Sequence, residues 1–135
     1  MLKALAMNDD FLTRLSDNPL ATVAAFYAGC LASSDKALSF ALDEFKLTAD
    51  EVAEQQVGFS DRTLGTLIPS KSVRTGRAIR DTLTTLGVYK GNGRETLRGY
   101  VTVPIRDYDE VVIGIRGYKV DRNSQGTNTV VVGVE

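Results

Sequence analysis

Histidine is absent from the sequence, and cysteine occurs once, at Cys30. A lone cysteine cannot form an intramolecular disulfide, so the stapled scaffold of many small secreted proteins is excluded. Zinc sites built from cysteine and histidine are excluded as well, together with triads and general bases that depend on histidine. Any metal bound by this chain would need hard, oxygen-bearing ligands.

Long apolar stretches are also missing. The opening segment 1–7 is followed at once by Asp9 and Asp10. No segment there is long enough for a signal peptide or a membrane span. Together with the single cysteine, this predicts a soluble, cytoplasmic protein that makes no membrane contact.

Neither sign of charge dominates, because 16 Lys and Arg residues stand against 17 Asp and Glu residues, for a net charge of −1. The distribution along the chain is uneven, however. Residues 1–70 carry 5 basic and 10 acidic side chains, a net −5, whereas residues 71–135 carry 11 basic and 7 acidic ones, a net +4. An anionic partner would therefore be contacted by the second half.

The length of 135 residues suits one compact domain. We expect a single domain over 1–135 and divide it by pattern into three parts. These are an N-terminal extension (1–17), a helical part (18–56) and a basic α/β part (57–135).

Helical periodicity dominates the sequence between Asn18 and Gln55. Asn18 can cap a helix that starts with Pro19 and runs to Leu31, and its many Ala and Gly residues would let a neighbouring element approach closely. A second helix is predicted over 37–45. Thr48 and Glu51 have the spacing of a capping box, which predicts a third, short helix through about Gln55.

Residues 57–135 are predicted to form one long helix and several extended segments. Apolar residues at helical spacing predict a helix from Val73 to Leu86, with its arginines on the exposed side. Period-two patterns predict strands over 100–103, 111–120 and 129–134. Further predictions are an extended piece over 57–59, a loop or short strand over 64–69, a strand interruption at Pro104, and turns over 106–109 and 121–128. The predicted class is α+β, in which N-terminal helices precede a small, mainly antiparallel sheet with one long helix.

Basic residues in the second half have the composition of a phosphate-binding surface, because guanidinium groups bind phosphate oxygens in pairs. Tyrosines lie between them and could stack on unpaired bases. The alternative is that a small domain exposes its charges and fills its sheet with tyrosines in any case. The candidate nucleic-acid or phosphate ligands are Arg74, Arg77, Arg80, Lys90, Arg94, Arg98, Arg106, Arg116 and Lys119, and the candidate stacking residues are Tyr100 and Tyr118.

Two other motifs have simpler structural interpretations. The run 91–94, Gly-Asn-Gly-Arg, lacks the Lys-Ser/Thr ending of a phosphate loop and is typical of a glycine-rich turn. Asp107, Asp109 and Glu110 could hold magnesium, but Asp at a turn between strands is ordinary turn chemistry. We therefore predict no catalytic residue and no metal ligand in this chain.

Three stretches resemble the catalytic core of bacterial-type DNA primases. The segment 24–31 resembles the family's opening helix, and 37–59 resembles its next block, which ends in a Gly-aromatic step. The third stretch, 98–118, is the most specific. It is similar to the family's arginine, hydrophobic strand, Phe-Pro-Ile-Arg-Asp turn and Val-Ile-Gly strand, which read here as Pro104-Ile105-Arg106-Asp107 and Val112-Ile113-Gly114.

The resemblance implies the fold of the N-terminal subdomain of the primase core. In that family a neighbouring Toprim domain binds metals, and the cleft between the two holds template and nucleotides. A zinc-binding domain upstream helps to select the start site. The resemblance covers neither of these domains, so we expect magnesium or manganese only on a Toprim partner and no cofactor in this chain.

By position, the resemblance carries over Arg98 and Arg106, while Arg116 is displaced from the family's glycine-glycine-arginine step. Phe45 stands near the place of a family arginine. The Lys-Tyr-Leu-Asn-Ser stretch that follows the sheet in that family is absent here.

We expect a primase-related domain that binds single-stranded DNA, an RNA–DNA hybrid or nucleotide phosphates, and that acts in replication without catalysis by the isolated chain. One alternative is a decayed primase-like protein of a phage or mobile element that binds or inhibits a replication or defence protein. Another is a small nucleotide-binding enzyme that uses the turn 107–110.

Overall fold

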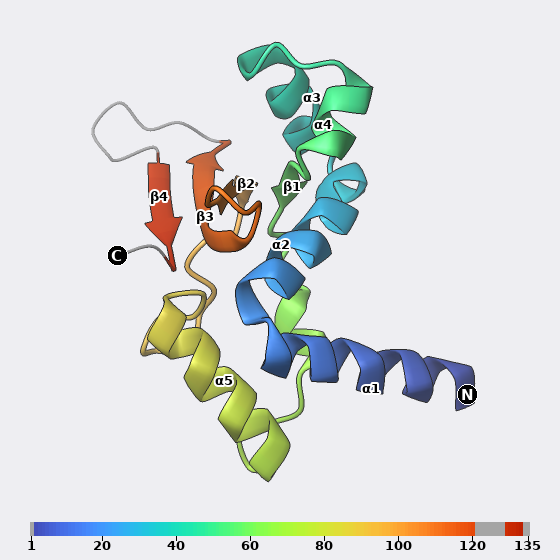
Figure 1. Ribbon diagram of the computed structural model, residues 1–135, viewed down its shortest axis with the longest axis vertical. Coiled ribbons are helices and arrows are strands. Elements are labelled where there is room, and N and C mark those ends of the chain that lie inside the picture. The colour runs from blue at the N-terminus through green and yellow to red at the C-terminus, as the bar shows by residue number, and fades with distance from the viewer. Residues whose placement is uncertain (1, 121–128, 134–135) are drawn as a thin grey trace.

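The computed structural model describes residues 2–120 and 129–133, so the turn predicted over 121–128, the strand end at Val134 and Glu135 lie outside the described residues. Helices dominate the first half, and most of the sheet comes from the second (Figure 1). In chain order the elements are α1 (Leu2–Asp17), α2 (Pro19–Cys30), the 3₁₀ turn η1 (Leu31–Ser33), α3 (Asp35–Glu44), α4 (Ala49–Glu54), β1 (Gly58–Phe59), the 3₁₀ turn η2 (Leu64–Leu67), α5 (Arg74–Leu86), β2 (Tyr100–Arg106), β3 (Val112–Lys119) and β4 (Thr129–Val132).

The sheet has the order β1-β2-β3-β4, and every neighbouring pair is antiparallel. This arrangement confirms the predicted α+β class with its small antiparallel sheet. The extended piece predicted over 57–59 forms the short edge strand β1. The segment predicted as a loop or short strand over 64–69 contains η2, which is a helical turn instead.

The strand β2 does not stop at Pro104, contrary to the prediction. Tyr100 accepts a hydrogen bond from Ser60 on the β1 side, and alternate residues of a strand direct their backbone groups to the same side. Pro104 therefore directs its nitrogen to that side too, but β1 begins at Gly58, opposite Thr102. The missing N–H faces an open edge, where no ladder bond is lost.

Helix α2 packs against one face of the sheet, as its small side chains predict. A Cβ at Gly58 would collide with backbone atoms of Tyr27 and Ala28, so only glycine lets the strand lie this close to the helix. Val23, Ala24 and Tyr27 are buried in the resulting core with Ile115 of β3. Figure 1 shows α2 in the middle of the molecule, beside β1.

A second apolar cluster covers the opposite face at the β1–β2 side. Val101 and Val103 of β2 pack there against α3 and α4, where Ala37 and Ala41 are fully buried. The predicted capping box of α4 is present: Glu51 donates its backbone N–H to Thr48 Oγ1 at 3.1 Å, and Thr48 donates its own to Glu51 Oε1 at 3.0 Å.

Two helices depart from the predictions. No helix was predicted over 1–17, yet α1 fills this region and buries Leu15 in the main core. Asn18 stands between α1 and α2, but its side chain makes no capping bond.

No helix in the described part of the chain is long and apolar enough to cross a membrane.

The long predicted helix is α5, which lies below the sheet in Figure 1. Ile79 and Leu83 anchor its apolar side in the main core, and the helix ends at Gly87, whose φ of 92° is accessible chiefly to glycine.

Candidate functional site

The three arginines of α5 do not share the exposed side, contrary to the prediction. Arg74 and Arg77 are exposed, whereas Arg80 is half-buried. Each three-residue step advances about 300° around a helix at about 100° per residue. Arg80 is therefore rotated well away from Arg74 and reaches the protein interior.

Arg80 is held by backbone carbonyl groups of the segment that contains η2. Its Nε donates to the Pro69 carbonyl at 2.9 Å, and its Nη2 donates to the Ile68 and Gly65 carbonyls at 2.9 and 3.1 Å. The guanidinium also lies over the Tyr89 ring, 6.0 Å from the centroid. Arg80 thus ties α5 to the preceding segment with a fixed geometry, and its Nη1 has no hydrogen-bond acceptor in the part of the chain that the structure describes.

A tight turn at residues 60–63 presents Arg62. Asp61 Oδ1 accepts hydrogen bonds from the Thr63 backbone N–H at 3.2 Å and from Thr63 Oγ1 at 2.5 Å, and Asp61 Oδ2 accepts one from Ser33 at 3.2 Å. Partial burial raises the pKa of Asp61, but these hydrogen bonds outweigh it and hold that pKa below its usual value. Arg62 itself has a φ of 73°, so the turn orients an exposed cation.

The glycine-rich run 91–94 forms a turn, as predicted. Gly93 donates to the Lys90 carbonyl at 2.9 Å, Lys90 donates to the Arg94 carbonyl at 2.8 Å, and Asn92 Oδ1 accepts from the Arg94 backbone at 3.0 Å. Tyr89 and Glu95 form an antiparallel bridge at the base of this turn. The turn brings Arg94 and the following Arg98 toward Arg80.

These three segments enclose a surface pocket of about 210 Å³, the arginine pocket. None of its four arginines forms an ion pair with a carboxylate of the described residues. The pocket is lined by Arg62, Gly65, Arg80, Tyr89, Gly93, Arg94, Glu95 and Arg98.

A buried carboxylate forms one wall of the arginine pocket. Glu95 is only 8% exposed, and its Oε2 accepts hydrogen bonds from Tyr27 at 2.9 Å and from Ser60 at 2.5 Å. Burial, together with the neighbouring Glu95 charge, raises the pKa of Tyr27 well above its usual value. Tyr27 therefore stays protonated, and the network fixes the position of Glu95 against α2 and β1.

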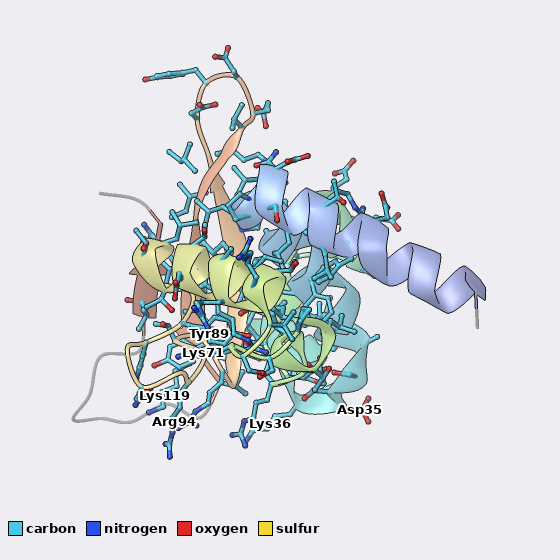
Figure 2. All side chains as sticks on the ribbon, turned by 90° about the horizontal axis from the view of Figure 1, so that it is seen from below. Asp35, Lys36, Lys71, Tyr89, Arg94 and Lys119 are labelled. Atoms are coloured by element: carbon cyan, nitrogen blue, oxygen red, sulfur yellow. The ribbon has the colours of Figure 1, made fainter. Side chains whose placement is uncertain are left out.

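Tyr89 contributes a hydroxyl that the fold leaves unused. Its side chain is 5% exposed, and among the described residues its Oη has no hydrogen-bond partner. Burial, and secondarily the charge of Glu95, raises the pKa of Tyr89 to about 12. The hydroxyl is thus protonated at neutral pH and can donate a hydrogen bond. Figure 2 shows Tyr89 deeper in the molecule than Arg94.

The other candidate ligands are distributed over several surfaces. Lys119 pairs with Tyr100 across β2 and β3, so it lies at the same end of the sheet as Arg98, and Figure 2 shows Lys119 and Arg94 on the same side of the molecule. Lys90 is exposed in the glycine-rich turn. Arg77 donates through Nε to the Lys71 carbonyl at 3.2 Å.

Two candidate ligands lie away from the arginine pocket. Arg106 is at the far end of β2, about 20 Å along the strand from Tyr100, and its Nη2 donates to Gln56 at 2.5 Å. Arg116 stands opposite Val103, on the sheet face covered elsewhere by α3 and α4. These two arginines cannot act together with the pocket on one phosphate group.

The two candidate stacking residues differ in environment. Tyr118 is already stacked edge-on against Phe45, with ring centroids 4.9 Å apart. Tyr100 is half-buried and packs beside Gly117, on the other face of the sheet. Tyr100 follows Arg98 by two residues, so it is the nearer of the two tyrosines to the arginine pocket along the chain. Its ring has no aromatic partner among the described residues.

The acidic turn between β2 and β3 uses its first carboxylate internally. Asp107 Oδ1 accepts hydrogen bonds from the backbone of Asp109 at 2.9 Å and of Val111 at 3.0 Å. This is the turn chemistry predicted for Asp107. Within residues 2–120 and 129–133, no three Asp, Glu, Cys or His side chains are grouped so that they could hold a metal ion.

Sequence reasoning missed three contributors to the arginine pocket, which are Arg62, Tyr89 as a donor, and Glu95. The signal for Arg62 was local, because Ser-Asp-Arg-Thr after an extended piece is a typical turn sequence. Glu95 had no such signal, since its partners Tyr27 and Ser60 are far away in the chain.

Comparison with known proteins finds similarity in structure but not in sequence. No protein-family model matches the chain, and a search of curated proteins gives no match. Among solved structures, the Aquifex aeolicus primase (zinc-binding and RNA polymerase domains) superposes with a TM-score of 0.64 at 18% identity, covering 93% of this chain and 30% of that one.

Two further primase structures superpose on this chain with similar TM-scores. A DnaG primase catalytic domain bound to single-stranded DNA gives a TM-score of 0.62 at 22% identity over 94% of this chain and 40% of its own. The RNA polymerase domain of Mycobacterium tuberculosis primase DnaG gives 0.61 at 22% identity over 91% and 39%. This chain therefore has a primase-like fold, and it spans well under half the length of these structures.

Proposed function

We propose that this chain is a primase-related domain that binds single-stranded DNA through the arginine pocket. It corresponds to the N-terminal subdomain of a primase core and acts in replication beside a partner that carries a metal-binding Toprim domain. The isolated chain binds template or an RNA–DNA hybrid but does not catalyse primer synthesis. Magnesium or manganese belongs to the partner.

The observation that carries this proposal is the concentration of four unpaired guanidinium groups in one pocket. Arg62, Arg80, Arg94 and Arg98 come from three separate segments, yet all line the same pocket. These four positive charges face a single carboxylate in the pocket wall, Glu95, so a net positive charge remains that an anionic ligand would neutralise. Phosphate is the biological anion whose oxygens guanidinium groups match in geometry.

The structural neighbours support DNA as the source of that phosphate. One is a primase catalytic domain bound to single-stranded DNA. Another is a primase RNA polymerase domain in complex with a double-stranded oligomer that has a 6-nucleotide overhang. This chain spans about 40% of the length of that single-stranded-DNA-bound domain.

Fluorescence anisotropy of a labelled single-stranded oligonucleotide tests the proposal. Four phosphate contacts on a single strand predict a slope of log K against log salt of about −3, so the affinity should fall about 50-fold between 50 and 200 mM salt. If the chain does not bind the oligonucleotide even at 50 mM salt, the proposed DNA contact is wrong.

A second candidate function is suggested by apolar side chains beyond the core. Tyr108 is fully exposed, and Val111, Ile113 and Val131 are 50, 37 and 44% exposed. Tyr108, Val111 and Ile113 lie within six residues of one another at the β2–β3 hairpin, and apolar side chains exposed on one local surface are typical of a protein contact, which fits the decayed, partner-binding alternative. Co-elution with a purified replication protein that is lost when Val111→Ser and Ile113→Ser are combined, in a chain that does not bind DNA, would favour this function over the first.

A further inference from the structure

The arginine pocket contains two neighbouring hydrogen-bond donors, Tyr89 Oη and Arg80 Nη1, that donate to no acceptor among the described residues. Tyr89 Oη is buried and has no partner among the described residues. A buried hydroxyl without a partner destabilises a fold, so a native structure that keeps one calls for an explanation. A ligand that accepts a hydrogen bond from the Tyr89 hydroxyl would explain why the fold keeps this group.

The second fixed donor is Arg80 Nη1. The other donating atoms of this guanidinium, Nε and Nη2, are bonded to the carbonyls of Gly65, Ile68 and Pro69. Because the guanidinium is planar and rigid, these three bonds also fix Nη1. Arg80 Nη1 therefore needs no reorganisation to bind a ligand, unlike an exposed arginine.

Gly65 shows that the two donors lie close to the same point. A Cβ added at Gly65 would lie 3.3 Å from Tyr89 Oη and 3.8 Å from Arg80 Nη1. The absence of a side chain at this position keeps the space beside both donors open. Any larger residue would occupy it.

We propose that Tyr89 Oη and Arg80 Nη1 form a seat for one phosphate group at the bottom of the arginine pocket, while the exposed Arg62, Arg94 and Arg98 contact adjacent phosphates of the same ligand. This inference rests on the proposed function and names the chemical group that the pocket holds. The phosphate comes either from a DNA backbone or from the triphosphate of a nucleotide.

The size and charge of the pocket agree with a single phosphate. Its volume of about 210 Å³ is below the roughly 300–1,000 Å³ of pockets that bury a drug-sized ligand. The pocket therefore holds one group of a larger ligand and leaves the rest outside. Glu95 offsets one of the four positive charges, which leaves the net positive charge that an anion requires.

The test is isothermal titration calorimetry of the full chain with three probes: inorganic phosphate, adenosine triphosphate without metal, and a single-stranded oligonucleotide. Tyr89→Phe removes only the hydroxyl and keeps the ring beneath Arg80. Tyr118→Phe removes a hydroxyl from the opposite face of the sheet and is the matched control. Gly65→Ala fills the space beside both donors without removing either.

We expect Tyr89→Phe to weaken binding of inorganic phosphate about tenfold, as for loss of one hydrogen bond to a charged group. Gly65→Ala should weaken it at least as much, and Tyr118→Phe should change it less than twofold. The melting temperature of Tyr89→Phe without ligand should equal or exceed that of the wild type, because a buried hydroxyl without a partner is removed. A purely structural role for Tyr89 would lower it.

The probes separate the two sources and the two proposals. Weaker oligonucleotide binding by Tyr89→Phe identifies a backbone phosphate, and weaker triphosphate binding alone identifies a nucleotide. If the wild type binds the oligonucleotide and Tyr89→Phe binds all three probes equally well, the phosphate seat is wrong and the proposed function stands. If phosphate binding depends on Tyr89 but the oligonucleotide does not bind, the seat is right and the DNA contact is wrong.

Discussion

The two ends of the sheet carry similar side chains and use them differently. At the pocket end, where Tyr100 pairs with Lys119, the neighbouring arginines form no ion pair with a carboxylate of residues 2–120 and 129–133, and they line a pocket. At the hairpin end, where β2 turns into β3, Arg106 is bonded to Gln56, and Asp107 is bonded to the backbone of its own turn. Figure 2 shows this turn at the top, opposite the labelled Arg94 and Lys119.

The difference shows that the number of basic residues in a segment does not define a binding site. What matters is whether the fold has already used their donors. Arg80 has both kinds of donor in one side chain. Its Nε and Nη2 are bonded to backbone carbonyls of the fold, whereas Nη1 has no acceptor among the described residues.

Removing the exposed arginines of the arginine pocket should abolish most DNA binding. The triple variant Arg62→Ala, Arg94→Ala and Arg98→Ala should weaken binding of a single-stranded oligonucleotide about 100-fold at 50 mM salt. Its salt slope should fall by about 2, since each lost phosphate contact on a single strand removes about 0.7. Anisotropy measures both quantities.

The matched variant for that experiment is Arg106→Ala with Arg116→Ala, which removes charges from the hairpin end and from the opposite face. It should retain wild-type affinity within about threefold and most of the salt slope. Equal losses in the two variants would mean that DNA is attracted by net charge alone and that the pocket has no special role.

Arg80 should matter for stability, unlike the exposed arginines of the same helix. Arg80→Ala removes the guanidinium that donates to three backbone carbonyls and should lower the free energy of unfolding by about 2 kcal/mol. Arg74→Ala should change it by less than about 0.5 kcal/mol. Urea denaturation measures both, and a neutral Arg80→Ala would contradict the structural part of its role.

Changing a carboxylate to an amide should alter phosphate binding at the pocket end and leave it unchanged at the hairpin end. Glu95→Gln keeps an oxygen that accepts from Tyr27 and Ser60 but removes a negative charge from the arginine pocket, so inorganic phosphate should bind about threefold more tightly. Asp107→Asn keeps the acceptor for its turn and should leave phosphate binding unchanged. Calorimetry compares the two variants, and weaker binding by Glu95→Gln would indicate that Glu95 accepts a hydrogen bond from the ligand instead.

Local patterns were sufficient to predict most of the helices and strands. The capping box at Thr48 is a signal carried by a few neighbouring residues and is present as predicted, and α5 ends at Leu86, where the apolar spacing predicted its end. The strand β2 was predicted too short because the effect of Pro104 depends on where the neighbouring strand β1 begins. Helix α1 was missed because no capping signal precedes it.

The site could be predicted only in part, since it depends on contacts between distant segments. Arg80, Arg94 and Arg98 were named as phosphate ligands, and the structure brings these three together. The carbonyl groups of 65–69 determine which arginine of α5 points inward. Every residue has a backbone carbonyl, so the sequence does not show which of them will accept a hydrogen bond from a side chain. Arg62 lies in the acidic half of the chain, so charge distribution gave no reason to select it.

The central claim is that the pocket end, and not the hairpin end, contacts single-stranded DNA. Titration of the isotope-labelled chain with an oligonucleotide, followed by amide chemical shifts in NMR spectra, tests it most directly. The account predicts the largest shifts at Gly65, Tyr89 and residues 93–98, with little change over 107–111. Shifts concentrated over 107–111, or no shifts anywhere at low salt, would contradict it.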